Sequence, residues 1–122
     1  MPKALVVEDE DSIRWILAAQ LEEKGYLVQE ASSGAIALQR VGEQIPDVIF
    51  VDILMPFMDG FELISSLRDN PKTSDVPVVL VTGLDPHETK GKPRQLGVKY
   101  HLTKPWEPWA LDSVLRKIFN PG

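Results

Sequence analysis

Five short apolar runs, separated by segments with helical spacing, constrain the fold of this chain more than any other feature. The runs cover residues 4–7, 26–28, 48–51, 76–81 and 100–102. The first, third and fourth are almost continuously apolar and rich in β-branched residues, which is typical of strands buried on both faces of a parallel sheet. The pattern therefore predicts five strands, of which at least three are internal.

Apolar residues spaced three or four positions apart lie between these runs and predict amphipathic helices. The stripes are Ile13, Ile16, Leu17 and Leu21; Ala35, Leu38 and Val41; Phe61, Ile64 and Leu67; and Leu111, Leu115 and Ile118. We expect the first helix to follow a cap at Asp11 or Ser12 and to stop at Gly25, and the second to close at Gly42. The last helix is expected from Trp109 or Ala110 to Phe119.

Strands that alternate with helices indicate βαβ units and a parallel sheet covered on both faces. Five such repeats in 122 residues predict an α/β fold, a flavodoxin-like three-layer α/β/α domain with a five-stranded parallel sheet of order 2-1-3-4-5. The length fits one domain, residues 1–122. Residues 120–122 are read either as a terminus or as the start of a linker.

The fourth helix is the weakest predicted element. Between Pro86 and Pro93, Gly91 and Pro93 stand where a helix interior would lie, and an interior proline costs about 3 kcal/mol. We expect this helix to be short, kinked or partly unwound.

Charge and composition narrow the class of protein. The absence of cysteine excludes disulfides, thiolate metal sites and a thiol nucleophile. The net charge of −5 divides into −9 over residues 1–85, +4 over 86–104 and zero over 105–122. An acidic chain with no apolar stretch long enough to cross a bilayer predicts a cytoplasmic domain without direct nucleic-acid or membrane binding, although the basic strip favours an acidic partner.

Polar residues follow the predicted strands at one edge of the sheet. Glu8 and Asp9 follow the first strand, Asp52 the third, Thr82 the fourth and Lys104 the fifth. Ligands of open parallel sheets bind beyond the carboxyl ends of the strands, so we expect these five side chains to meet there.

Clustered carboxylates repel one another, and a hard divalent cation, most simply Mg²⁺, relieves that repulsion. A cation, an ammonium and a hydroxyl around one carboxylate are suited to phosphoryl transfer. Asp52 ends the most apolar strand and is the candidate nucleophile that becomes an aspartyl phosphate.

Four motifs carry a resemblance to a known family along the whole chain. They are LVVEDE at 5–10, PDVIFVDILMP at 46–56 followed by MDG at 58–60, VLVTG at 79–83, and LTKP at 102–105. Together they resemble the receiver domain of two-component response regulators. The resemblance implies a signalling phosphoacceptor that catalyses only its own phosphorylation and dephosphorylation and is not a metabolic enzyme.

The resemblance assigns roles to the site residues. Asp52 matches the phosphoacceptor, and Lys104 matches the lysine that pairs with the phosphoryl group. Glu8 and Asp9 match the acidic pair that binds Mg²⁺ with Asp52, although many relatives have Asp where this chain has Glu8. Leu54 would lend its backbone carbonyl to the ion.

Further positions concern switching and local geometry. Thr82 matches the hydroxyl that moves toward the phosphoryl group, and His101 stands at the family's aromatic switch position, with Tyr100 expected on the opposite face of the strand. The Lys104–Pro105 bond matches a position that is usually cis. Gly60 matches a turn glycine, for which conformational freedom is the expected reason.

Partners and lifetime are expected from the same resemblance. The donor is a histidine kinase or a histidine phosphotransfer protein, recognised by exposed residues of the first helix such as Arg14, Trp15 and Ala18. The output passes to an effector domain or protein through the 86–104 face, where phosphorylation would order the weak helix. Apolar Leu54 and Leu84 leave no side chain to orient water, which predicts a long-lived phosphoryl group.

Three alternatives stay open. Trp106 and Trp109 are interpreted as a packed start of the last helix or as a partner anchor, and a weak homodimer is compatible with the sequence. A receiver-like module that signals without phosphate is the alternative function. A Mg²⁺-dependent phosphohydrolase is disfavoured because position 54 is leucine, not a second acid–base carboxylate.

Overall fold

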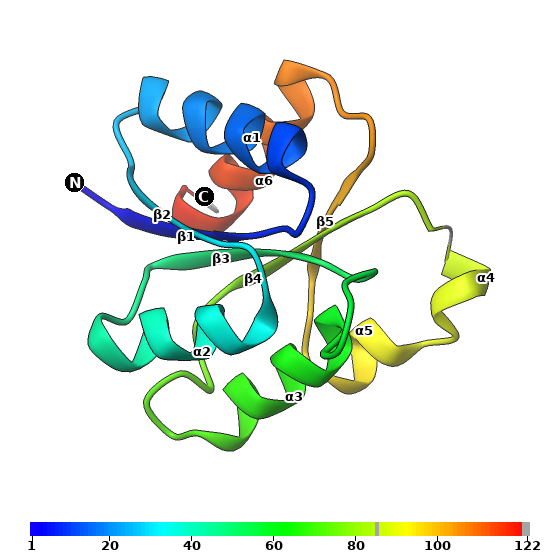
Figure 1. The fold of residues 1–122 in the computed structure, drawn as a ribbon. Coiled ribbons are helices and arrows are strands. Elements are labelled where there is room, and N and C mark those ends of the chain that lie inside the picture. The colour runs from blue at the N-terminus through cyan, green and yellow to red at the C-terminus, as the bar shows by residue number, and fades with distance from the viewer. Residues whose placement is uncertain (85, 121–122) are drawn as a thin grey trace.

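The computed structural model describes residues 1–84 and 86–120 and contains one five-stranded parallel sheet. The strands, in the order β2-β1-β3-β4-β5, are β1 (Lys3–Val7), β2 (Leu27–Ala31), β3 (Val48–Asp52), β4 (Val78–Thr82) and β5 (Tyr100–Thr103). Helices cover both faces (Figure 1). The predicted fold class and strand order are confirmed.

Strand register brings the carboxyl ends of the strands to one edge. Val7 pairs with Ala31 and Val51, Asp52 pairs with Val81, and Thr82 pairs with Thr103. Residues that follow these positions therefore emerge side by side, although they are far apart in the chain.

Six helices complete the layers in the part of the chain that the structure describes. They are α1 (Asp11–Glu23), α2 (Gly34–Glu43), α3 (Gly60–Asp69), α4 (Pro86–Thr89), α5 (Lys92–Gln95) and α6 (Pro108–Phe119). Figure 1 shows α1 and α6 on one face of the sheet, α2, α3 and α5 on the other, and α4 at the side of the molecule. Within the described residues, no helix combines the length and the apolar character needed to cross a membrane.

The sheet separates two hydrophobic clusters. On one side Phe50 packs with Leu17 and Leu21 of α1, and on the other Ile49 packs with Ile64 of α3. All five of these side chains are almost completely buried. Burial of a leucine or phenylalanine side chain contributes about 1.5–3 kcal/mol, so the helical stripes hold both outer layers on the sheet.

Several boundary predictions were wrong. Gly42 does not end the second helix, which continues to Glu43. Ile16 is 53% exposed and does not belong to the buried stripe of α1. The second strand occupies residues 27–31 rather than 26–28, because Leu27 begins the pairing with β1.

The expected weakness of the fourth helix is confirmed. The segment forms two one-turn helices, α4 and α5, separated by Lys90 and Gly91, whose φ angles of 51° and 77° are left-handed. Pro93 lies in the first turn of α5, where a missing N–H costs no hydrogen bond. The residues 121–122 of the predicted terminus or linker lie outside the described residues.

Candidate functional site

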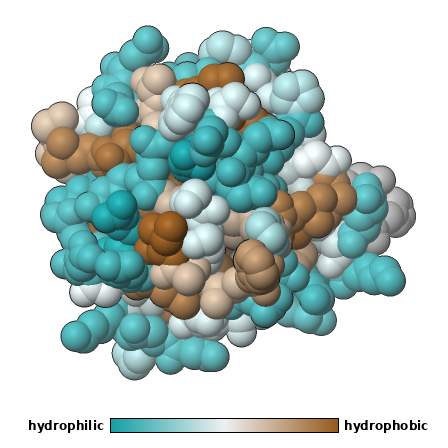
Figure 2. All heavy atoms as spheres, viewed as in Figure 1, coloured by the Kyte–Doolittle hydropathy of each residue, from teal (hydrophilic) through white to brown (hydrophobic). Residues whose placement is uncertain are grey.

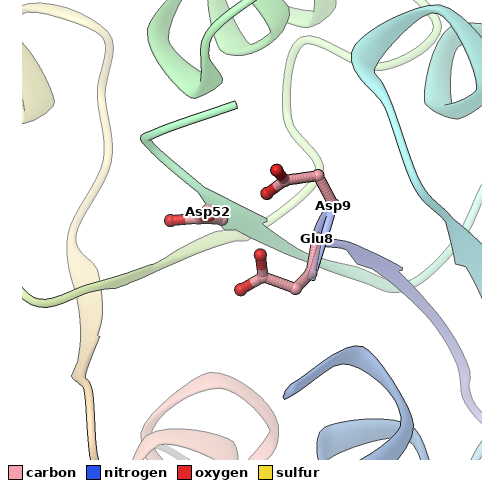
Figure 3. Close-up of side chains that lie close together, drawn as sticks. All are labelled: Glu8, Asp9 and Asp52. Atoms are coloured by element: carbon pink, nitrogen blue, oxygen red, sulfur yellow. The ribbon is translucent and has the colours of Figure 1, made fainter. Parts of the chain in front are cut away.

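Three carboxylates gather beyond the ends of β1 and β3 (Figure 3). One oxygen each of Glu8, Asp9 and Asp52 lies within 4.8 Å of the others. Glu8 and Asp52 are 3% and 5% exposed, whereas Asp9 is open to solvent. The strands thus hold two acidic groups inside the protein and a third at its surface.

Lys104 supplies the positive charge of this cluster. Its Nζ lies 2.5 Å from Oε1 of Glu8 and 3.3 Å from Oδ1 of Asp52. The backbone N–H of Lys104 donates to the carbonyl of Thr82 at 2.9 Å, which ties the lysine to the end of β4. The Lys104–Pro105 bond is cis, as expected.

Burial and charge shift the protonation of these groups. Burial, together with neighbouring Asp52, raises the pKa of Glu8, although the bond from Lys104 opposes this. Burial and the adjacent Glu8 also raise the pKa of Asp9. Burial disfavours the ammonium of Lys104, but its bond to Glu8 and the charge of Asp52 outweigh burial and raise its pKa. The single positive charge of Lys104 therefore does not fully offset the burial and mutual repulsion of Glu8 and Asp9.

Thr82 lies at the neighbouring strand end with its side chain buried. Its hydroxyl accepts the backbone N–H of Leu84 at 3.0 Å. The backbone N–H of Leu54 points to Oδ1 of Asp52 at 3.4 Å, while the Leu54 side chain is 65% exposed. The structure thus brings Glu8, Asp9, Asp52 and Lys104 into one cluster and holds Thr82 on an adjacent strand.

Gly60 supports the site for a different reason than expected. Its φ is not positive, but an added Cβ would lie 2.4 Å from the carbonyl oxygen of Asp52 and 2.8 Å from Cα of Ile53. The N–H of Gly60 donates to the carbonyl of Ile53 at 2.8 Å. Close packing behind Asp52, not conformational freedom, therefore requires glycine.

Two of the three predicted docking residues on the first helix are not exposed. Ala18 is 3% exposed. The Arg14 side chain is 11% exposed and donates to the carbonyl of Glu8 at 2.9 Å as well as to Asp11 and Glu30. Arg14 therefore braces the loop that carries the acidic pair, a role that its position on a helix did not reveal. Trp15, at 58% exposure, fits the prediction.

His101 and Tyr100 point to opposite faces of β5, as alternation predicts. Tyr100 packs with the cluster on the α1 and α6 side. His101 is exposed, and its Nε2 lies 3.2 Å from the hydroxyl of Thr103. His101 also borders a cavity of about 160 Å³ that Thr82 and Leu84 line. Its side chain thus has room beside the predicted switch threonine.

The two tryptophans near the site differ. Trp106 is half-buried, and its Nε1 donates to Oε1 of Gln20 at 2.9 Å, which joins the loop before α6 to α1. Trp109 is 70% exposed. The interpretation as a packed start of the last helix therefore applies to Trp106 and not to Trp109.

Exposed apolar side chains occur in the loop that follows β3. Phe57, five residues after Asp52, is fully exposed and has a φ of 70°. It occupies the centre of a γ-turn in which the N–H of Met58 donates to the carbonyl of Pro56 at 2.8 Å. Figure 2 shows separate hydrophobic patches on a largely hydrophilic surface. Sequence reasoning did not find this strained position.

The donor set fits a hard divalent cation. Three carboxylate groups converge, and burial and neighbouring acids raise the pKa of two of them. Mg²⁺ prefers oxygen ligands and retains water, which the exposed position of Asp9 allows. Glu8, Asp9 and Asp52 are therefore suited to hold the ion.

Comparisons with known proteins agree with this geometry. The family model "Response regulator receiver domain" matches residues 4–116. The Vibrio cholerae chemotaxis protein CheY4 superposes with a TM-score of 0.92 at 32% identity, over 98% of this chain and 99% of that one.

Two curated relatives are longer proteins. The "Probable transcriptional regulator ycf27" of Guillardia theta is 37% identical over 97% of this chain and 45% of its own length. The response regulator PleD of Caulobacter vibrioides is 35% identical over 95% of this chain and 26% of its own length. The chain thus spans less than half of either relative. The matches establish that this chain belongs to the response-regulator receiver domain family of two-component signalling.

Proposed function

We propose that Asp52 accepts a phosphoryl group from a phosphohistidine donor, with Mg²⁺ held by Glu8, Asp9, Asp52 and the backbone carbonyl of Leu54. The observation that carries this proposal is the buried carboxylate of Asp52, with an ammonium at 3.3 Å and two further carboxylates beside it. Phosphoryl transfer depends mainly on such positioning and charge neutralisation.

The protein's own residues have distinct parts in the transfer. An oxygen of Asp52 forms a bond to phosphorus while the phosphorus–nitrogen bond breaks, and the imidazole leaves with the electron pair. Lys104 then donates to a phosphoryl oxygen, for which it exchanges part of its bonding to Glu8. Mg²⁺, when bound, would neutralise charge on the phosphoryl oxygens.

Switching would follow from the change of charge at Asp52. Phosphorylation replaces about one negative charge by about two and adds strong acceptors. Thr82 has the one side-chain hydroxyl of β4, and this hydroxyl would release the N–H of Leu84 when it turns toward the phosphoryl group. His101 would respond in the cavity beside it, and the 86–104 face would pass the change to an effector.

The donor is proposed to be a histidine kinase or a histidine phosphotransfer protein. Trp15 and Ile16 are exposed on α1, and an open groove lined by Ile13, Ile16, Pro105 and Trp106 leads to Lys104. A partner helix bearing the phosphohistidine would reach Asp52 from this side.

Intact-mass measurement after incubation with Mg²⁺ and acetyl phosphate tests the proposal. The parent chain should gain one phosphoryl group, and Asp52→Asn should gain none. The double variant Trp15→Phe/Trp109→Phe keeps Trp106 as its one tryptophan. Its emission should report binding of beryllium fluoride, because Trp106 directly follows Lys104 and Pro105 in the chain. Absence of phosphorylation and of a Trp106 response would favour the phosphate-independent module instead.

A further inference from the structure

The basic switch segment, residues 86–99, has two parts that lie differently against the sheet and its helices. Its second part, from α5 to the start of β5, lies beside α3, whereas α4 stands away from the sheet (Figure 1). Leu96 and Val98 pack against the core cluster under α2 and α3.

Arg68, at the end of α3, makes the attachment of the second part. Its Nε donates to the carbonyl of Leu96 at 3.0 Å, and Nη2 lies 3.5 Å from the carbonyl of Gly97. Its Nη1 donates to the carbonyls of Ser74 and Val76 at 3.0 and 2.8 Å. One planar guanidinium thus joins α3, the loop before β4 and the loop before β5.

Two further features separate the parts. The Nζ of Lys92 lies 5.4 Å from the ring centroid of Phe61 on α3, a cation–π contact that holds the start of α5. Immediately before it, Lys90 and Gly91 adopt left-handed φ angles, and no atom lies within 4 Å of a Cβ built on Gly91. The chain can therefore rotate at Lys90–Gly91 without losing packed contacts at the glycine.

We propose that Arg68 is a positioning residue that fixes α5 and residues 96–98 to α3, so that phosphorylation moves α4 alone about a hinge at Lys90–Gly91. The inference rests on the proposed function, because occupation of Asp52 is the trigger. It limits the movable part of the face to α4. The basic residues Lys92, Arg94 and Lys99 then form a fixed surface beside a moving one.

Amide exchange read by mass spectrometry, with and without Mg²⁺ and beryllium fluoride, tests this division in the parent chain. Exchange of residues 86–90 should change on binding, while residues 92–98 should keep the same protection. An equal change in both parts would overturn the proposal. If Trp106 fluorescence shows no binding at all, the proposed function fails and not the division.

Arg68→Lys keeps the charge but cannot bridge four carbonyls with one ammonium. Loss of one or two such hydrogen bonds should speed exchange of 92–98 about tenfold, and the ligand-induced change should now spread from 86–90 into 92–98. Arg94→Lys, on exposed α5, is the matched control and should behave as the parent. Unaltered exchange at 92–98 in Arg68→Lys would contradict the proposal, and the parent measurement stands even if this variant does not fold.

Discussion

The acidic site and the switch segment are held to the same sheet in different ways. Glu8 directly follows β1 and Asp52 ends β3, all of whose residues are buried, and both acidic residues are at most 5% exposed. The switch segment has two one-turn helices, left-handed residues between them, and no buried residue in α5. The difference is consistent with the proposed division, in which the acidic site keeps its geometry and any movement is confined to the α4 part of the switch segment.

Gly60→Ala should give the largest loss of stability, because it disturbs the tightly packed backbone behind Asp52. The new methyl group would meet the Asp52 backbone at 2.4 Å, and that backbone belongs to a fully buried strand that cannot move aside. We expect a loss of about 2–4 kcal/mol in the free energy of unfolding, measured by urea denaturation.

Gly42→Ala is the matched control for this substitution. Gly42 lies within α2, and a Cβ added to it would have no neighbour within 4 Å. Alanine there should stabilise the protein by about 0.5–1 kcal/mol through helix propensity. Equal stability of Gly60→Ala and the parent would show that the site is less rigid than the packing indicates.

Mg²⁺ should stabilise the protein by binding to the carboxylate cluster, which is separate from the Lys90–Gly91 hinge. At ten times its Kd the ion should raise the free energy of unfolding by about 1.4 kcal/mol. Asp9→Asn should reduce this gain, because it removes the solvent-exposed carboxylate of the cluster, whereas Asp11→Asn, outside the cluster, should retain it. Thermal unfolding with and without Mg²⁺ measures both, and an undiminished gain in Asp9→Asn would contradict the ligand assignment.

Much of the difference between the acidic site and the switch segment was predictable from the sequence. The features that could not be predicted have physical causes. Apolar runs report burial on both faces of a sheet, so the strand order and the meeting of Glu8, Asp52 and Lys104 followed from pattern and topology. Gly91 and Pro93 indicated the broken helix because both act through the local backbone.

Contacts between distant residues were not predictable. Neither Arg68 nor the brace made by Arg14 shows a local pattern, since both bind carbonyls supplied by other segments. Gly60 was recognised but given the wrong cause, because the close approach of Asp52 depends on tertiary packing. The strained backbone at Phe57 was not predicted, since the sequence has no glycine or asparagine there to indicate a left-handed φ.

Leu84→Glu tests whether the residue at position 84 sets the lifetime of a phosphoryl group on Asp52. Leu84 lies two residues after Thr82 and is apolar, so it offers no polar group that could orient water near a phosphorylated Asp52. A glutamate there should shorten the phosphoryl half-life on the order of tenfold, less than the 10²–10⁴-fold of a fully positioned general base. Leu84→Met keeps the volume and should preserve the lifetime. Decay of the phosphorylated mass with time decides, and an unchanged half-life in Leu84→Glu would refute this role.

Opposite substitutions at the hinge should give opposite, smaller effects. Gly91→Ala places a side chain at a φ of 77°, while Lys90→Gly removes one from a φ of 51°. We expect the first to cost about 1 kcal/mol in the free energy of unfolding and the second to gain a similar or smaller amount. Urea denaturation measures both. Two changes of the same sign would mean that left-handed strain does not shape the Lys90–Gly91 hinge.

The pH dependence of stability should distinguish the two regions most finely. The pKa of Glu8 is raised from 4.5 in the folded protein, mainly by burial. Between pH 4.5 and the raised pKa, the folded state binds more protons at this group than the unfolded state, so ionising Glu8 costs stability as pH rises. Lys104 acts in the same direction at a much higher pH: because its pKa is raised from 10.5, its stabilising contribution persists through neutral pH and is lost only as the pH rises above that value.

Glu8→Gln isolates the Glu8 contribution when unfolding is followed as the pH rises from 4.5, the ordinary pKa of the group, toward neutrality, in buffer without divalent ions. Relative to the variant, the parent should lose stability with rising pH, because only the parent must ionise a buried acid. Glu43→Gln, at the exposed end of α2, should parallel the parent across the range. The net slope should be small, since the bond from Lys104 offsets part of the burial. If the free energies of unfolding of Glu8→Gln and the parent changed with pH in parallel, burial of Glu8 would have no effect on its ionisation. The acidic site and the switch segment would then differ in packing alone.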